Sequence, residues 1–170
     1  MDSTSKAKAD LVPYTPDYAG QVRLWIDSEE TYDLVCRGIE FPPPDDIVDS
    51  WQRKGVRSFL LFSSSRPVAY GELWERKAEQ AMEVAHLLVD PARRRQGYAT
   101  RLLELIYDRG ASVRWVRKVL ANLYHQSPEA LGCYLKAGFE LTGTSTHIEG
   151  LKMMRKVEKT SKNQPHKGIK

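Results

Sequence analysis

The spacing of hydrophobic residues changes several times along the chain, and each change predicts a new element. Short runs that are apolar throughout, or at alternate positions, indicate β-strands. Such runs occupy residues 11–14, 58–62, 68–74, 82–89, 116–124, 139–143 and 151–157. Apolar residues three and four positions apart instead indicate helices with one buried face, over 16–35, after Asp46, after Gly97 and after Ser127.

Residues that favour turns and helix ends mark the boundaries of these elements. Residues 38–46, with three consecutive prolines, predict a loop, and residues 63–67 predict a turn between strands. Asp45 or Asp46 is suited to cap the second helix, while Ser127 is suited to cap the last one, which Gly138 ends. Antiparallel strands followed by a β-α-β-α-β order predict an α/β fold. Its mixed sheet would be mostly antiparallel, with helices on both faces.

Composition narrows the class of protein. The chain has 170 residues, which suits one domain at 11–157 between polar tails, 1–10 and 158–170, that we expect to be flexible. Its 26 basic and 22 acidic side chains give a net charge of +4, too small to indicate a nucleic-acid partner. No apolar run approaches the roughly 20 residues of a membrane span, and none forms a signal peptide. Cys36 and Cys133 form no disulfide or metal-binding pattern, so we expect a cytoplasmic protein.

The most informative segment, residues 89–100, joins an apolar strand to an amphipathic helix. The first amides of a helix have no partners within it and lie at the positive end of its dipole, so such a turn can hold phosphate groups. Gly97 permits a backbone conformation that a side chain would block, and neighbouring arginines add positive charge. The alternative is an ordinary turn with solvated arginines, and the short pattern alone does not separate the two.

Two motifs in this half of the chain resemble the GCN5-related N-acetyltransferase (GNAT) family. Arg94, Gly97 and Ala99 match its Arg/Gln-x-x-Gly-x-Gly/Ala signature, which follows Leu-Val-Asp-Pro at 88–91. Residues 134–139, Tyr-Leu-Lys-Ala-Gly-Phe, look like the Y-x-K-x-G-F end of a later helix in the family. The resemblance covers residues 58–157. It implies that two central parallel strands, 82–89 and 116–124, splay apart around acetyl-CoA.

The resemblance also implies roles for individual residues. Backbone groups of Leu87, Leu88 and Val89 would line the pantetheine arm, and one amide would stabilise the oxyanion that develops on the thioester. The pyrophosphate would be held by the amides of Arg95, Gln96, Gly97, Tyr98, Ala99 and Thr100. Tyr134 would protonate the departing thiolate, although a core aromatic on this helix would have the same spacing. Ser127 stands where many members have an asparagine that contacts coenzyme A, so it makes a shorter contact or only caps the helix.

An amine acceptor must lose a proton, and a carboxylate could accept it directly or through water. Glu83 is the first candidate, because it matches the position of the glutamate base in the histone-acetylating branch of the family. A solvated residue at the strand edge is the alternative, and Glu72 on the neighbouring strand is the second candidate. Strand alternation puts His86 on the opposite face from Glu83 unless a bulge intervenes, so we interpret it as a core histidine.

The acceptor is less well defined than the donor. Trp25, Trp51 and Trp74 could wall an acceptor pocket, but each lies on an apolar face, where core packing explains it. Acidic residues from Asp27 to Asp46, including Asp45, would favour a cationic amine, or they form a solvated face.

These observations together predict direct transfer of acetyl from acetyl-CoA to a primary amine. A small-molecule acceptor is favoured over a protein, and no metal, nucleic acid or membrane is expected to take part. The alternatives are transfer of a longer acyl group, transfer to protein N-termini or lysines, and a coenzyme A-binding regulatory domain without turnover. The sequence leaves open whether the chain forms a homodimer.

Overall fold

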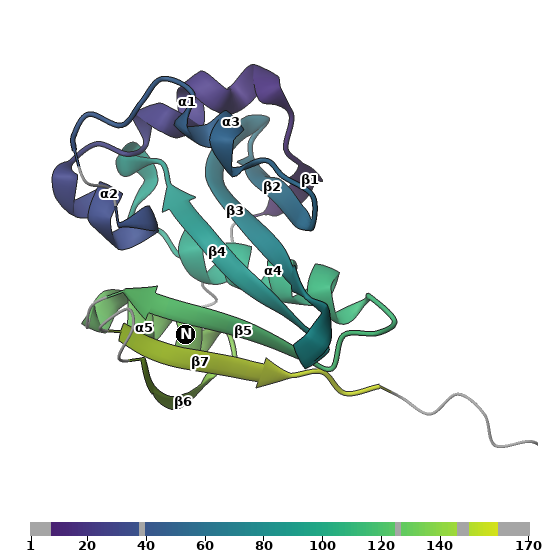
Figure 1. The fold of residues 1–170 in the computed structure, drawn as a ribbon. Helices are drawn as coiled ribbons and strands as arrows, with labels where there is room; N and C mark the ends of the chain where they lie inside the picture. The colour runs from purple at the N-terminus through teal and green to yellow at the C-terminus, as the bar shows by residue number, and fades with distance from the viewer. Residues whose placement is uncertain (1–7, 38–39, 125–126, 146–149, 160–170) are drawn as a thin grey trace, which may run out of the picture.

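The computed structural model describes residues 8–37, 40–124, 127–145 and 150–159. Most of the two expected tails, together with Gly38 of the predicted loop, lies outside the described residues. The described chain forms a seven-stranded sheet covered by helices (Figure 1). Among its helices, none has the length and apolar character needed to cross a membrane.

The strands alternate in direction except at one central pair. In chain order they are β1 (Ala9–Pro13), β2 (Val56–Ser63), β3 (Arg66–Arg76), β4 (Ala81–Val89), β5 (Lys118–Tyr124), β6 (Glu140–Ser145) and β7 (Gly150–Lys156). Their order across the sheet is β1-β2-β3-β4-β5-β7-β6. Neighbouring strands are antiparallel except β4 and β5, which are parallel. The predicted mixed, mostly antiparallel sheet is therefore confirmed.

The helices come in two groups, one before the first hairpin and one after β4. The α-helices are α1 (Ala19–Leu24), α2 (Glu29–Cys36), α3 (Ile47–Trp51), α4 (Tyr98–Ala111) and α5 (Pro128–Lys136). Short 3-10 helices are η1 (Pro16–Tyr18), η2 (Lys77–Glu79) and η3 (Pro91–Arg93). Helix α5 has the predicted ends, since Ser127 caps it and Gly138 follows it with φ 85°.

The single helix predicted over 16–35 is wrong, because the chain breaks between α1 and α2. Ser28 is extended, with φ −157° and ψ 162°, and its hydroxyl accepts a hydrogen bond from the Thr31 amide. The Thr31 hydroxyl in turn donates to Asp27. Short polar side chains that bind nearby backbone groups favour caps over helix interiors. Apolar residues on both sides of the break share one buried face, so their spacing alone did not reveal it.

The turn between β2 and β3 is shorter than predicted, and both strands are longer. Ser64 and Ser65 have φ 50° and 65°, so two left-handed residues close the hairpin. Such turns match the twist of the strands and let pairing continue up to the turn itself. Ser63 accordingly pairs with Arg66.

Each face of the sheet has its own apolar cluster. We call the face covered by α4 and α5 the α4 face, where Leu102, Leu103, Ile106, Tyr134 and Phe139 are buried. We call the face covered by α1, α2 and α3 the α2 face, where Val22, Trp25, Trp51, Leu60 and Tyr70 are buried. Figure 1 shows these two helix groups on either side of β3 and β4. Helices therefore cover both faces, as predicted.

Candidate active site

Strands β4 and β5 pair only over their first halves. The paired positions run from Ala81 with Lys118 to Val84 with Ala121. Beyond these positions β4 continues to Val89 and β5 to Tyr124 without pairing to each other. Figure 1 shows the two strands diverging, and we call the place where they part the fork. The predicted splayed pair is present, and its separated edges carry backbone groups that need other partners.

A β-bulge lies in the second half of β4, residues 85–89, which does not pair with β5 and which we call the freed half. Gly71 of β3 faces two residues of β4, His86 and Leu87, where regular pairing would give it one. His86 has φ 48°, in the left-handed region. Position 71 favours glycine, because a Cβ there would lie 2.7 Å from side-chain atoms of both Leu87 and Ile106, which would have to shift. The bulge therefore directs the Leu87 side chain toward α4 and the preceding His86 side chain to the other face of the sheet.

The bulge puts His86 on the α2 face, together with Glu83. Glu83 pairs with Trp74 across the two strands, and the His86 ring meets the Trp74 ring edge-on at 5.2 Å. Nδ1 of His86 also lies 3.0 Å from Oε2 of Glu72. Strict alternation, which puts His86 opposite Glu83, is wrong here because the extra residue reverses the alternation.

The turn from β4 to α4 is held open by two left-handed residues. Arg95 has φ 62° and Gly97 has φ 83°, and α4 begins directly afterwards at Tyr98. The Asp90 side chain fixes the start of the turn by accepting from the Ala92 amide at 2.9 Å. A Cβ on Gly97 would meet no atom within 4 Å. Gly97 is thus required by its backbone angle rather than by crowding, and it borders open space at the helix N-terminus.

The predicted pyrophosphate residues lie together at this turn and differ in their side-chain contacts. Arg95, Gln96 and Gly97 are exposed, whereas Tyr98 is buried, with its hydroxyl 3.0 Å from that of Ser63. Ala99 and Thr100 lie in the first turn of α4. The amides of such a first turn have no acceptors within the helix.

Arg94 ties the turn to the chain that follows α1. Its guanidinium lies 3.1 Å from Asp27 and donates to the backbone oxygen of Trp25 at 3.3 Å. Burial alone would raise the pKa of Asp27, but hydrogen bonds from Arg94 and Thr31 and the charge of Arg94 hold that pKa below its usual value. The charge of Arg94 is therefore already compensated. The structure gives it a positioning contact between two loops.

Tyr134 projects from α5 into the α4 face. Only 6% of its surface is exposed, and its ring meets that of Phe139 edge-on at 5.4 Å. Burial raises the pKa of Tyr134 well above its usual value, and the charges of Cys133 and Glu83 add to the effect. The phenol therefore keeps its proton throughout the neutral range, which is the state that a proton donor needs.

Ser127 acts as a helix cap. Its hydroxyl accepts a hydrogen bond from the Ala130 amide at 3.3 Å. This is the capping alternative that the sequence left open for this position.

Glu83 reaches the fork but is already engaged. The Arg76 guanidinium binds one carboxylate oxygen at 2.6 and 2.7 Å, and the Asn122 amide donates to the other at 2.7 Å. Asn122 directly follows Ala121, the last residue of β5 that pairs with β4. Both oxygens of Glu83 therefore have partners, one of them a cation.

Glu72, which ranked behind Glu83 as a base on sequence grounds, is fully buried. It accepts from the Tyr70 hydroxyl at 2.5 Å and from the Trp74 indole at 2.6 Å, and it contacts His86. Burial and the neighbouring charge of Glu72 raise the pKa of Tyr70, which keeps that hydroxyl a donor. The signal was a carboxylate in an apolar strand, flanked two positions away by side chains that can donate. A charged residue in such a strand needs partners.

The tryptophans divide between core and site. Trp25 is buried among apolar residues of the α2 face. Trp51 is buried too, but its ring stacks on His86 at 4.2 Å. Trp74 is half-buried, with the guanidinium of Arg53 4.7 Å from its ring centre. Core packing therefore describes Trp25 fully, whereas Trp51 and Trp74 also contact the histidine beside the fork.

The acidic residues before the first hairpin differ in their contacts. Asp45 pairs with Arg23 at 3.1 Å, and its side chain is fully exposed. Asp46 occupies the N-cap position of α3, but its side chain makes no capping hydrogen bond. Asp27 is paired with Arg94, as described above. The solvated alternative fits Asp45, and nothing in these contacts directs its charge to an acceptor.

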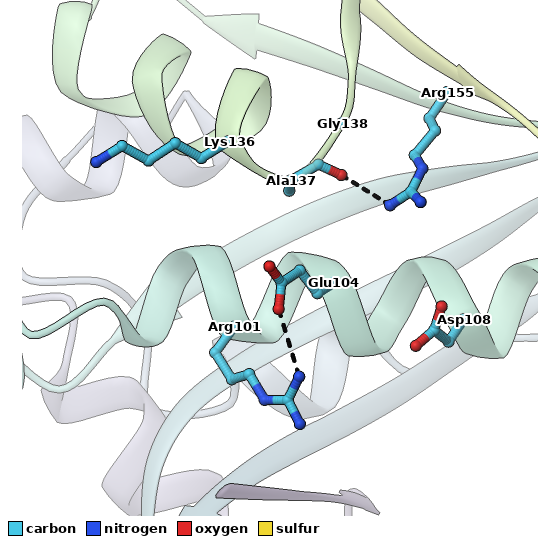
Figure 2. A pocket seen from close by; sticks show the side chains of 7 residues that line it. All are labelled: Arg101, Glu104, Asp108, Lys136, Ala137, Gly138 and Arg155. Atoms are coloured by element: carbon cyan, nitrogen blue, oxygen red, sulfur yellow. Dashed lines mark hydrogen bonds and ion pairs between the residues drawn. The ribbon is translucent and has the colours of Figure 1, made fainter. Parts of the chain in front are cut away.

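A charged cavity lies elsewhere, between α4 and the end of α5 (Figure 2). Its volume is about 360 Å³, and its charged lining comes from Arg101, Glu104, Asp108, Lys136 and Arg155. Arg101 pairs with Glu104 at 3.3 Å, and Arg155 donates to the Ala137 backbone oxygen at 2.8 Å. No residue of β4 or β5 lines this cavity, so it is separate from the fork.

Comparison with known families identifies the fold. The family model described as the acetyltransferase (GNAT) family matches residues 20–139, which include the turn at Gly97 and Tyr134. The chain belongs to the GNAT acetyltransferase family. The resemblance noted in the two sequence motifs is thereby confirmed, and the match also reaches α1 and α2. Among curated proteins, none matches the chain.

Solved structures of several acetyltransferases share this fold at low identity. Aminoglycoside acetyltransferase AAC(6')-Ib, solved with coenzyme A and kanamycin, is 16% identical with a TM-score of 0.73, over 88% of this chain and 95% of that one. Spermidine N-acetyltransferase from Vibrio cholerae, solved with coenzyme A and spermine, is 13% identical with a TM-score of 0.74, over 89% and 97%. An acetyltransferase from Thermus thermophilus is 24% identical with a TM-score of 0.69, over 88% and 97%.

Proposed function

We propose that the chain transfers the acetyl group of acetyl-CoA to a primary amine of a small molecule. The observation that carries this proposal is the fork, where a parallel strand pair separates beside the helix N-terminus at Gly97. Membership of the GNAT family supports acetyl transfer. Similar folds solved with coenzyme A and with kanamycin or spermine support the donor and a small amine as the acceptor.

The residues around the fork fit acetyl-CoA, which supplies an acetyl group activated as a thioester. The freed half of β4 offers the backbone of Leu87, Leu88 and Val89 to the pantetheine arm. The diphosphate would be held by the amides of Arg95, Gln96, Gly97, Tyr98, Ala99 and Thr100. The open space beside Gly97 leaves room for it. We assign Ser127 to the cap of α5 rather than to the ligand.

Tyr134 is the proposed proton donor to the sulfur that leaves. Its raised pKa keeps the phenol protonated at neutral pH, and a thiolate of pKa about 8.5 leaves more readily as it gains a proton. Glu83 stays a prediction as the base. Its two carboxylate oxygens already bind Arg76 and Asn122.

Binding of acetyl-CoA is tested first, because it separates this proposal from a protein without a coenzyme A site. At 100 times its Kd, acetyl-CoA should stabilise the folded state by about 2.7 kcal/mol. For a chain of this size, that raises Tm by roughly 5–10 °C. A Tm that acetyl-CoA leaves unchanged would contradict the proposal.

Turnover then separates an enzyme from a regulatory domain that only binds coenzyme A. Thiol release is followed with spermine, kanamycin, single amino acids, and a peptide with a free N-terminus and a lysine. We expect release with at least one small amine. Release only with the peptide would favour a protein acceptor, and a higher rate with a longer acyl-CoA would favour another acyl group. Binding without any release would favour a regulatory domain.

A further inference from the structure

Glu72 and His86 form a pair on the α2 face to which the proposed function assigns no role. We propose that His86 is the base that accepts the proton from the acceptor amine, and that Glu72 is a positioning residue that holds the His86 ring. This inference rests on the proposed acetyl transfer and identifies the group that would prepare the amine.

The contacts of Glu72 bear on which nitrogen of His86 carries a proton. The Trp74 indole can only donate, and the Tyr70 hydroxyl donates as well, so each oxygen of Glu72 accepts one of these two hydrogen bonds. The third contact, 3.0 Å from Nδ1 of His86, completes the set around a carboxylate with no exposed surface. In the proposed arrangement Nδ1–H donates to Glu72, which leaves the lone pair of the neutral ring on Nε2.

The ring of His86 is held in one orientation by two tryptophans. Trp51 stacks on one face at 4.2 Å with an interplanar angle of 26°, and Trp74 meets the ring edge-on at 79°. No hydrogen bond joins Nε2 to another residue in the part of the chain that the structure describes. The side chain keeps 10% of its surface exposed, so it is not sealed in the core. A fixed ring with an unused acceptor nitrogen is what a base requires.

The backbone brings His86 to the fork. It lies two positions beyond Val84, the last residue of β4 that pairs with β5, and it directly precedes the segment proposed to line the pantetheine arm. The left-handed φ of 48° is unfavourable for most residues other than glycine and is sustained here by the bulge. Strained residues of this kind concentrate at functional sites.

Glu83 is the competing base, and its surroundings differ from those of His86. Both of its oxygens already accept hydrogen bonds, Oε2 from the Arg76 guanidinium and Oε1 from the Asn122 amide. A proton taken up by Glu83 would have to displace one of these hydrogen bonds. Glu83 would then position Arg76 and Asn122 at the fork.

Other ionisable groups on this face set the charge around His86. They come from the elements that pack there and include Asp33 and Cys36 of α2, Arg37 directly after it, Asp49 of α3, Arg53 before β2, Tyr70, Glu72 and Arg76 of β3, Glu83 of β4, and Tyr124 of β5. Glu83 and Arg76 pair with each other, and Glu72 is the carboxyl group in direct contact with the His86 ring.

The proposed reaction conserves every proton. Nε2 of His86 takes one proton from the ammonium form of the acceptor and later releases it to solvent. The neutral nitrogen of the acceptor amine then forms a bond to the acetyl carbon, and the carbon–sulfur bond breaks with its electron pair on sulfur. Tyr134 gives its proton to that sulfur. The second proton of the amine, lost as the amide forms, restores Tyr134.

The sharpest variant is His86→Asn. Asparagine tolerates left-handed backbone angles, and its amide can donate to Glu72 as Nδ1 does, but it has no basic nitrogen. With the amine that gives the highest wild-type rate, we expect kcat to fall by at least about 100-fold. The acidic limb of the kcat/KM profile should disappear, while the Kd for acetyl-CoA stays within threefold. Glu83→Gln should retain the limb. Glu75→Gln, on the same strand as Glu72 but paired with Arg57 outside the site, is the control.

Nitrogen NMR tests the positioning role of Glu72 without any acceptor amine. The chain has four histidines, so loss of one signal set in His86→Asn assigns the ring. In the neutral wild-type ring we expect Nδ1 to carry the proton and Nε2 to be unprotonated. Glu72→Gln should disturb this tautomer and lower kcat, whereas Glu75→Gln should change neither.

The outcomes separate this inference from the proposed function. Turnover by the wild-type with a kcat for His86→Asn within fivefold would overturn the role of His86 and leave acetyl transfer intact. Loss of the acidic limb in Glu83→Gln alone would assign the base to Glu83. A neutral ring protonated at Nε2 would overturn the role of Glu72. If the wild-type acetylates no amine, the proposed function fails and this inference fails with it.

Discussion

The two halves of β4 have similar apolar sequences and opposite environments. From Ala81 to Val84 the strand is hydrogen-bonded on both edges, to β3 and to β5. From Ala85 to Val89 it pairs only with β3, and through a bulge. The first half is an ordinary central strand. The second half leaves one edge unpaired in the middle of a sheet, and every residue of the proposed site lies beside that edge or on the elements that flank it. The proposed site therefore results from a strand pair that ends early rather than from an added loop.

The largest expected effect comes from Tyr134, which is buried in the apolar cluster of the α4 face. Tyr134→Phe removes the phenol proton and should lower kcat by about 100-fold or more, with little change in the Kd for acetyl-CoA. Tyr107→Phe is a matched control, because both tyrosines meet the Phe139 ring edge-on. The Tyr107 hydroxyl instead donates to the Lys156 backbone oxygen. Equal turnover by Tyr134→Phe and wild-type would remove Tyr134 from the mechanism.

The next effect concerns the turn that ends the freed half. Gly97→Ala puts a Cβ at φ 83° into the open space beside the helix N-terminus. We expect about tenfold weaker acetyl-CoA binding, measured by titration calorimetry, and a loss of about 1–2 kcal/mol of stability from the left-handed angle. In Gly132→Ala the Cβ also meets no atom within 4 Å, but inside helix α5. That control should gain about 0.5–1 kcal/mol and bind acetyl-CoA as the wild-type does. Unchanged binding in Gly97→Ala would contradict a diphosphate site there.

The bulge itself can be tested through Gly71. An alanine Cβ would lie 2.7 Å from side-chain atoms of Leu87 and Ile106, so these side chains must shift. We expect a loss of about 1–3 kcal/mol from overpacking, seen as a Tm lower by roughly 3–10 °C. A variant as stable as the wild-type would mean that the freed half is not packed tightly against α4.

The dependence of kcat on pH should show no ionisation of the buried Tyr134 in the range where an ordinary tyrosine begins to ionise. A raised folded-state pKa means that Tyr134 stays protonated when an ordinary phenol, of pKa about 10, begins to ionise. Tyr134 therefore contributes no alkaline loss of kcat up to about pH 10. Its contribution to stability is complete below pH 10 and is lost as pH rises toward the folded-state pKa. An alkaline limb below pH 9 that Tyr134→Phe abolishes would contradict this environment.

The smallest effect is expected at the contact between the turn and the chain after α1. Asp27→Asn removes the charge that Arg94 pairs with. Since both side chains are partly exposed, the loss in the free energy of unfolding should be below about 1 kcal/mol at neutral pH. The lowered pKa of Asp27 means that this stabilisation is present above about pH 4 and is lost as pH falls through the folded-state value. Chemical denaturation at low and high salt checks it, and a loss that salt leaves unchanged would point to packing instead.

The sequence predicted the fold well where periodicity and capping agreed. Ser127, Pro128 and Gly138 bounded α5 as expected, because each has a distinct physical role at a helix end. The break at Ser28 was not predicted, because the apolar positions of α1 and α2 share one buried face. The two-residue turn at Ser64 and Ser65 was also missed, since serine signals a turn without signalling its length.

The candidate residues of the proposed donor side could be found from the sequence, and those of the proposed acceptor side much less so. Gly97 and Tyr134 belong to motifs whose spacing is local, so the sequence carries them. The environments of Glu72 and His86 depend on a bulge and on pairing between β3 and β4. Alternation predicts the wrong face for His86 for this reason. Arg76 and Asn122, which both bind Glu83, likewise meet it only in the folded sheet.

A crystal structure with acetyl-CoA tests the central claim, that the unpaired edge of β4 binds the donor, most directly. We expect the pantetheine arm between β4 and β5, with hydrogen bonds to the backbone of Leu87, Leu88 or Val89. The diphosphate should lie on the amides around Gly97, and the thioester sulfur within reach of the Tyr134 hydroxyl. A complex in which β4 and β5 close together along their whole length, with the ligand elsewhere, would contradict the proposed site.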